Sequence, residues 1–238
     1  MSMIRRILAL DGVNVICHFR DDGYLPEAMC SWLARLGWSH GDDEVFTLDE
    51  LASLFDLDAV GRSAGQANFG KLDWQNQQFL ARLDGEELFA RVRPFLEAAA
   101  GRAVDDAPGL RALLELLRER SRTLADMAAQ ARWLVVADDQ LELDAKAVAK
   151  HWKPDAKPLL AALACALAEV EPWTAAAIEG AFEAVRAANG SPGMGKLAQP
   201  VRVALTGSAA SPGIFETVAV LPRERAVARI AAAAERIA

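Results

Sequence analysis

The chain has 238 residues, of which 53% are hydrophobic and 25% are charged, and its formal net charge is −7. This balance is typical of a folded protein and excludes intrinsic disorder, and at about 150 residues per domain the length predicts one large or two small domains. An acidic chain does not hold nucleic acid by bulk charge, so any nucleic-acid surface has to be a local basic patch.

The cysteines and the apolar runs bear on metal sites, targeting and membranes. The three cysteines lie far apart, and no Cys-x-x-Cys pair or Cys/His cluster occurs, so we expect no metal site. The apolar run after Arg5 and Arg6 is interrupted by Asp11 and Gly12, which indicates a strand and not a signal peptide. No run approaches the ~20 apolar residues that cross a bilayer. We therefore expect a cytoplasmic protein without a membrane partner, and an odd, sparse cysteine set fits that reducing compartment.

The start of the chain predicts a small β element followed by helices. Residues 7–10 and 13–19 are rich in β-branched and aromatic side chains on either side of an Asp-Gly turn, and this pattern predicts two strands. A helix is expected from Pro26, because proline suits the first helical position. Thr47 and Glu50 have the spacing of a capping box and predict another helix start.

The remainder of the chain is predicted to be helical with short connections. After a polar loop over 63–70, helices are expected from about Leu72, after Asp84, from about Leu110 and after Thr123,. The second half is rich in Ala, and its spacing predicts helices over 144–152, 157–170, 174–189, 200–205, 214–221 and 223–237,. The fold class is therefore mainly α with a small β element near the N-terminus.

Recognisable catalytic chemistry is missing from the sequence. No two of His18, His40 and His151 have metal-ligand spacing on a helix, and none follows a nucleophile motif,. The Gly-rich stretch at 190–196 lacks the spacing of a phosphate-binding P-loop,. Adjacent acidic pairs are typical of turns and caps. The residues alone indicate a binding module, with no catalytic and no metal-binding residue assigned.

Several segments, taken in order, resemble one family. These are Arg-Asp-Asp-Gly-Tyr-Leu-Pro-Glu-Ala at 20–28, Leu-Gly-Trp-Ser-His-Gly-Asp at 36–42, Asn68 with Lys-Leu and Trp-x-Asn after it, Gln-Pro-Val-Arg at 199–202, and Ser-Pro-Gly-Ile-Phe-Glu at 211–216. Together they resemble the C-terminal half of bacterial glutamyl-tRNA synthetase, a class I aminoacyl-tRNA synthetase, from about residue 20 to the end of the chain.

The resemblance implies a layout and a function. It implies a helical stem-contact region over 1–83 that includes the small β element, and an all-α anticodon-binding cage with subdomains over 84–142 and 143–238. In the family these parts bind tRNA for an enzyme that joins glutamate to tRNA(Glu) with ATP. We therefore expect tRNA(Glu) as the partner and no DNA.

The departures from the family concern catalysis. No His-x-Gly-His motif occurs, and where the Lys-Met-Ser-Lys-Arg type loop belongs, residues 6–10 read Arg-Ile-Leu-Ala-Leu. The resemblance thus implies that the catalytic domain is absent from this chain. ATP and glutamate would bind that absent domain, so no cofactor is expected here and the chain alone is expected not to catalyse the ligation.

Arginine suits the reading of splayed RNA bases, because its planar fork both stacks and donates two hydrogen bonds. A local patch of Arg111, Arg118, Arg120, Arg122 and Arg132 lies around the end of the helix predicted from Leu110. The resemblance implies that Arg120 reads the last anticodon base and that a C-terminal loop approaches the anticodon. The predicted tRNA-binding residues are Arg118, Arg120, Arg122, Arg202, Ser211, Pro212, Ile214 and Phe215.

Other interpretations of these residues stay open. The arginines are also what a solvated helix face carries, the 211–214 stretch is also an ordinary Pro-Gly turn, and most of the six tryptophans are expected in the core. A free-standing synthetase remnant, acting as a protein-interaction module without RNA binding, is the alternative function. A third possibility is an enzyme assembled with a separately encoded catalytic domain.

Overall fold

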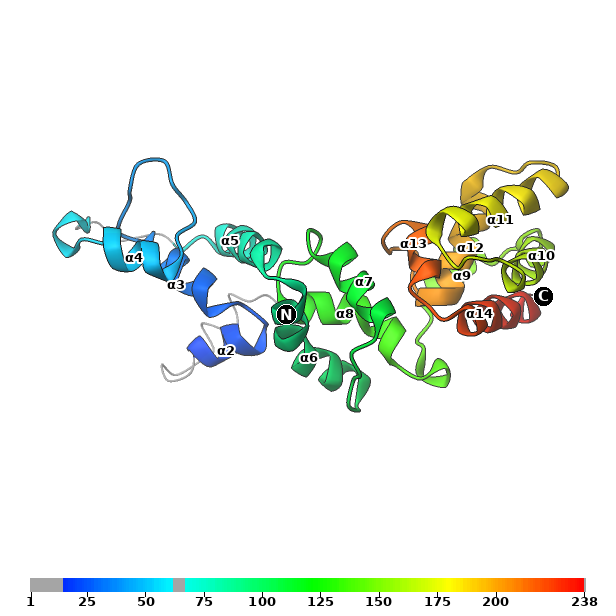
Figure 1. Cartoon of the computed structure of the whole chain (residues 1–238), viewed down its shortest axis with the longest axis horizontal. Helices are drawn as coiled ribbons and strands as arrows, with labels where there is room; N and C mark the ends of the chain where they lie inside the picture. Colours follow the sequence, from blue (N-terminus) through cyan, green and yellow to red (C-terminus); the bar gives the residue numbers. More distant parts are fainter. Residues whose placement is uncertain (1–14, 62–66, 238) are drawn as a thin grey trace. The chain divides into compact units, whose positions relative to one another are not determined.

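The structure is a computed structural model that describes residues 15–61 and 67–237 (Figure 1). Within these residues the chain forms thirteen α-helices, two short 3₁₀-helices and no strand. The predicted mainly α class is therefore confirmed. The chain divides into two compact units: unit 1 is Met1–Ala98 with Leu117–Ala129, and unit 2 is Ala99–Leu116 with Gln130–Ala238. The three-part division expected from the resemblance stays a prediction.

Unit 1 is built from short helices followed by two longer ones. They are α2 (Val15–Asp21), α3 (Pro26–Ala34), α4 (Leu48–Leu54), the 3₁₀-helix η1 (Leu57–Ala59), α5 (Phe69–Arg82), most of α6 (Gly85–Ala100) and the start of α8 (Leu124–Val135).

The predicted β element is not found in the described residues. The prediction of a strand over 13–19 is wrong from Val15 onward, because this stretch is the helix α2; residues 7–10 lie outside the described residues. Phe19 on α2 meets Tyr24 edge-on and stacks on Phe69, with ring centroids 5.5 and 6.3 Å apart. This aromatic packing outweighs the weak strand preference of the β-branched residues.

Most predicted helix starts are confirmed by their caps. Pro26 begins α3, Thr47 and Glu50 form the reciprocal capping box of α4, and Asp84 accepts the Glu87 backbone N–H at 2.8 Å. Helix α5 starts at Phe69, within the loop expected over 63–70. Its cap is Asn68, whose side chain accepts the Lys71 N–H at 3.2 Å.

Two polar contacts tie α3 into unit 1. Asn76 on α5 is fully buried, and its side-chain oxygen accepts the backbone N–H of Leu25 at 2.8 Å. Glu27 on α3 receives two hydrogen bonds from the Arg91 guanidinium of α6, at 3.0 and 2.8 Å. These bonds lower the pKa of Glu27 although its partial burial acts in the opposite direction.

Gly23 allows α2 and the start of α8 to meet. Its φ of +84° lies in the left-handed region, and its carbonyl accepts the Leu124 N–H at 2.9 Å. A Cβ built on Gly23 would lie 2.4 Å from the backbone nitrogen of Ala125. Both the conformation and the space therefore require glycine here.

We predict that Gly23→Ala lowers the free energy of unfolding of unit 1 by about 3 kcal/mol, since strain at a positive φ adds to a backbone clash. The matched control is Gly41→Ala, because Gly41 also has a positive φ (+53°) but nothing lies within 4 Å of its added Cβ. The control should lose only about 1 kcal/mol. Urea unfolding of both variants tests this, and equal losses would contradict the close approach.

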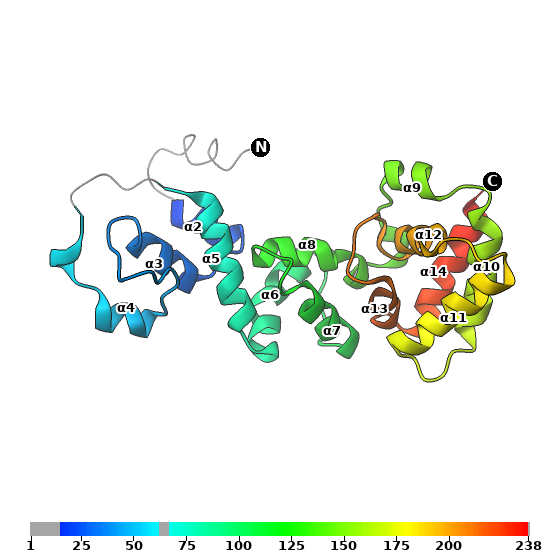
Figure 2. The same cartoon turned by 90° about the horizontal axis from the view of Figure 1, so that it is seen from above.

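Unit 2 is a helical bundle with Ala-rich interfaces. It holds α7 (Pro108–Leu117) up to Leu116, the end of α8, the 3₁₀-helix η2 (Asp138–Gln140), α9 (Ala145–His151), α10 (Ala156–Ala168), α11 (Ala175–Ala188), α12 (Met194–Thr206), α13 (Ile214–Ala219) and α14 (Arg223–Arg236). Helix α10 packs beside α11, α12 and α14, and α12 also contacts α9 and α13 (Figures 1 and 2).

Helix α12 begins earlier than the sequence predicts. The predicted helix over 200–205 starts instead at Met194, and Pro200 lies inside it. Pro200, Leu197 and Val201 are all buried. Their packing holds a helix across one glycine and a proline that would otherwise signal a loop and a helix start,.

An ion-pair network joins α14 to the end of α8. Asp138 receives hydrogen bonds from Arg225 at 2.8 Å and from Arg229 at 2.6 and 2.9 Å. Arg229 is 7% exposed, and it also donates to the carbonyls of Leu205 and Trp133. Burial raises the pKa of Asp138, but hydrogen bonds and charges from the two arginines outweigh it and hold this pKa below its ordinary value.

We predict that Arg229→Met lowers the free energy of unfolding of unit 2 by about 3 kcal/mol, because it takes the Arg229 donor from two buried carbonyls and removes two of the three hydrogen bonds that the arginines donate to Asp138,. The control is Arg223→Met, since Arg223 pairs with Glu171, whose side chain is 80% exposed. It should lose at most about 1 kcal/mol.

The difference in the free energy of unfolding between wild type and Arg229→Met should depend on pH. The native pKa of Asp138 is depressed, so its contribution is complete above the ordinary carboxyl value of about 4 and is lost as the pH falls through the native pKa. The difference between wild type and Arg229→Met should therefore shrink in acid. A difference that does not change with pH would count against the ion pair.

Candidate nucleic-acid interface

The turn between α7 and α8, residues 118–123, carries three of the predicted tRNA-binding arginines. The backbone N–H groups of Arg120 and Ser121 both donate to the Leu117 carbonyl at 3.0 Å. The Thr123 hydroxyl then caps α8 by accepting the Asp126 N–H at 3.1 Å, as the sequence predicts. The turn is thus closed by its own hydrogen bonds.

Helix α5 fixes this turn from the side. The Asn76 side-chain amide donates to the Arg122 carbonyl, and the Gln77 side-chain amide donates to the Glu119 carbonyl. Two consecutive α5 side chains therefore hold the backbone of the turn. They fix the backbone positions from which the side chains of Arg120 and Arg122 extend.

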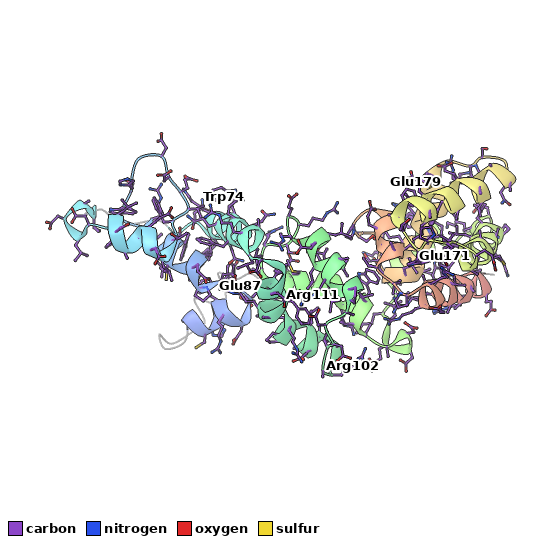
Figure 3. All side chains as sticks on the ribbon, in the orientation of Figure 1. Trp74, Glu87, Arg102, Arg111, Glu171 and Glu179 are labelled. Atoms are coloured by element: carbon purple, nitrogen blue, oxygen red, sulfur yellow. The ribbon has the colours of Figure 1, made fainter. Side chains whose placement is uncertain are left out.

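A pocket of about 300 Å³ lies between α5 and the turn. It is lined by Gly70, Asp73, Trp74, Gln77, Arg120 and Arg122. Trp74 is 41% exposed, the largest exposed aromatic surface in the described part of the chain, and Figure 3 marks its place on α5. An exposed indole beside two guanidinium groups offers a stacking face and charged donors in one place.

The three arginines of the turn differ in environment. Arg118 is half-buried and donates to the carbonyls of Ala81, at 3.3 Å, and Leu83, so it caps the end of α5. The Arg120 side chain is exposed and lines the pocket. The Arg122 side chain is 69% exposed and lies 3.5 Å from the Asp73 carboxylate.

Asp73 is anchored beneath the pocket by a second partner. The buried Tyr24 hydroxyl donates to its other carboxylate oxygen. Burial and this hydrogen bond raise the pKa of Tyr24 well above its ordinary value. One carboxylate oxygen of Asp73 therefore accepts a hydrogen bond from the neutral Tyr24 phenol. The other oxygen lies opposite the positive charge of Arg122.

Sequence reasoning did not single out Trp74 and Gln77 as site residues. Trp74 was one of six tryptophans, of which Trp32, Trp38 and Trp133 are buried. The available signal was the α5 spacing: Gly70, Trp74 and Gln77 recur at helical intervals on a side that carries no buried residue of that helix,.

The C-terminal loop brings together the other five predicted residues, within unit 2. The Arg202 guanidinium donates to the Ser211 hydroxyl and, at 2.6 Å, to the Pro212 carbonyl. The side chains of Pro212 and Ile214 are buried, and Phe215 meets Phe182 edge-on at 5.3 Å. These residues build and brace the loop in this structure, and their contact with tRNA stays a prediction.

The remaining arginines of the predicted patch have acidic partners in unit 2. Arg111 forms an ion pair with Asp106, and Arg132 lies 3.1 Å from a Glu142 carboxylate oxygen. Among the described residues there is no cluster of three or more His, Cys, Asp or Glu side chains suited to a metal ion. The helices described here are too short or too polar to cross a membrane.

Comparison with known proteins places these features in a family. Residues 87–234 match the family described as the anticodon binding domain. The glutamate–tRNA ligase of Anaeromyxobacter sp. (strain Fw109-5) is 42% identical over 225 residues, which cover 94% of this chain and 47% of the relative. That of Myxococcus xanthus is 42% identical over 223 residues, covering 94% and 46%.

A solved structure of a glutamate tRNA ligase also resembles this chain. The crystal structure of a glutamate tRNA ligase from Elizabethkingia meningosepticum superposes with a TM-score of 0.79 at 27% identity, over 92% of this chain and 43% of that one. This chain thus spans about half the length of the curated relatives it matches. The chain belongs to the anticodon binding domain family and is a homologue of bacterial glutamate–tRNA ligases over that part of their length.

Proposed function

We propose that this chain binds the anticodon arm of tRNA(Glu), as the tRNA-binding part of a glutamate–tRNA ligase. The observation that carries the proposal is the pocket in which exposed Trp74 lies between α5 and the turn that bears Arg120 and Arg122. Anticodon nucleotides are single-stranded, so their bases are open to stacking and to hydrogen bonds on their edges.

Each lining residue has a distinct role in the proposal. Trp74 supplies a face on which a base of any identity stacks. Arg120 donates to a base edge, which discriminates between bases, and Arg122 contacts a phosphate, which does not. In this proposal Arg118 and Asn76 are positioning residues that touch no RNA. Asn76 holds the turn from α5, and Arg118 binds from the turn to the end of α5.

In this proposal the ligation itself is carried out by a domain outside the half of the relatives that this chain matches. The relatives are named glutamate–tRNA ligases, and this chain spans about half their length. In this proposal ATP and glutamate bind a catalytic domain outside the matched half, and the ligation takes place in the cytoplasm. The alternative of a remnant that does not bind RNA has no support in these comparisons.

We predict different effects for two substitutions in the pocket, measured by gel shift or fluorescence titration with tRNA(Glu) and an unrelated tRNA. Trp74→Ala should weaken binding of both by about tenfold or more, because a stacked base contributes about 1–3 kcal/mol. Arg120→Ala should weaken the binding of tRNA(Glu) by a similar factor and should change the binding of the unrelated tRNA little.

The control for both variants is Arg93→Ala, because Arg93 is an exposed α6 arginine paired with Glu97 away from the pocket. Its affinity for tRNA(Glu) should match the wild type. If wild-type chain binds tRNA(Glu) no more tightly than the unrelated tRNA, the proposed function fails.

We predict that Arg122→Gln changes the salt dependence of tRNA binding. A lost phosphate contact should reduce the slope of log K against log salt by about 0.7 and lower the affinity for all tRNAs together. Arg120→Gln should leave this slope closer to that of the wild type. Titration at several salt concentrations separates the two arginines, and an unchanged slope for Arg122→Gln would remove its phosphate role.

A further inference from the structure

The segment from α4 to η1 in unit 1 consists of short helical turns whose side chains are largely exposed. Neither α4 nor η1 contributes a buried residue. Figures 1 and 2 show α4 running beside α3. A seven-residue helix without a buried side is not stable through its own hydrogen bonds,.

This segment is nevertheless held in place by specific contacts. Its capping box is complete, and the Phe46 N–H before it donates to the buried Ser31 hydroxyl at 3.1 Å. Lys71 on α5 binds the Glu44 carboxylate at 2.6 Å. The Phe55 ring lies 5.5 Å from that of buried Trp38. The surface is therefore preformed, and a ligand would meet it already ordered.

Exposed apolar side chains gather on this segment. Of the seven large hydrophobic residues that are exposed among those described, five lie in this segment, at positions 48–60, and a sixth, Leu33, lies on α3. Leu57 is 79% exposed and Leu48 is 51% exposed. Single exposed leucines are ordinary, but a local concentration of them marks an interaction surface. The full set is Leu33, Leu48, Leu54, Phe55, Leu57 and Val60.

The charge of residues 48–60 has one sign. They contain four Asp or Glu residues and no Lys or Arg. Asp49, Asp56 and Asp58 are all exposed beside the leucines. Phosphates would be repelled here, so this face is not the part of the expected stem-contact region that meets RNA. A second copy presenting the same face would be repelled as well.

We propose that the α4–η1 face, residues 48–60, is a docking surface for a protein partner that presents apolar side chains flanked by Lys or Arg. The leucines supply the apolar contact area, and the surrounding carboxylates select a basic partner and speed its approach. An amphipathic basic helix has this chemistry, because its apolar stripe fits against exposed leucines while its cationic flanks face the carboxylates.

The test is a fluorescence anisotropy titration of the full chain with two labelled amphipathic peptides, a Leu/Lys helix and a Leu/Glu helix with the same leucine positions. The Leu/Lys peptide should bind saturably at one site and the Leu/Glu peptide should not. The double variant Leu48→Ser/Leu57→Ser should weaken binding by about tenfold or more. Both leucines are exposed, so circular dichroism should be unchanged.

The charge contribution has its own matched pair. Asp56→Asn/Asp58→Asn should weaken binding several-fold and flatten its salt dependence. The amide oxygen introduced at position 56 can still accept the backbone bond that the Asp56 carboxylate accepts from the Asp58 N–H, at 2.9 Å. The control is Glu179→Gln, an exposed carboxylate on α11, which removes one acidic charge from a different helix and should leave peptide affinity unchanged.

Other outcomes identify other occupants and overturn the proposal. Equal binding of the Leu/Glu peptide, or no effect of the leucine substitutions, means that the face does not select a basic partner. Competition by tRNA assigns the face to RNA. Self-association that is lost in Leu48→Ser/Leu57→Ser assigns it to a second copy. Binding of tRNA itself should be unchanged in that variant, so failure here is distinct from failure of the tRNA proposal.

Discussion

One buried side-chain amide organises the candidate site of unit 1. Asn76 accepts the N–H of Leu25 ahead of α3 and donates to the carbonyl of Arg122 in the turn before α8. Three stretches distant in sequence thus share one residue that is fully shielded from water. A buried amide is costly unless its groups are satisfied, so each partner segment is held to the position that satisfies it. The pocket around Trp74 depends on that arrangement.

The sequence was most informative where structure is local. Helix caps such as Thr47, Asp84 and Thr123 depend on a side-chain oxygen and an N–H two or three residues later, and that spacing is visible in the sequence,. It was least informative where packing decides. Val15–Asp21 is helical because Phe19 joins an aromatic cluster whose other members come from the next turn and from later helices.

The candidate site shows the same limit. The sequence predicts a cluster of arginines near the end of α7, but it does not show which of them face solvent. Arg118 caps α5, because the end of that helix lies within its reach, and Arg120 lines the pocket. Trp74 is exposed although large aromatic residues are usually buried, and apart from the spacing along α5 nothing in the sequence distinguishes it from the buried Trp32,. The five residues around the C-terminal loop do meet, but through the internal bonds of Arg202, which the sequence does not reveal.

The hydrogen bonds between Arg202 and the C-terminal loop affect how that loop would bind a ligand. The Ser211 hydroxyl shares contacts with Arg202 and, at 3.0 Å, with the Thr217 hydroxyl, so the loop is ordered when the bundle folds. Conformational entropy is then lost at folding and not at encounter. A ligand that fits this loop would bind it nearly as a rigid body, with fast association and little change in heat capacity beyond that from the surface it covers.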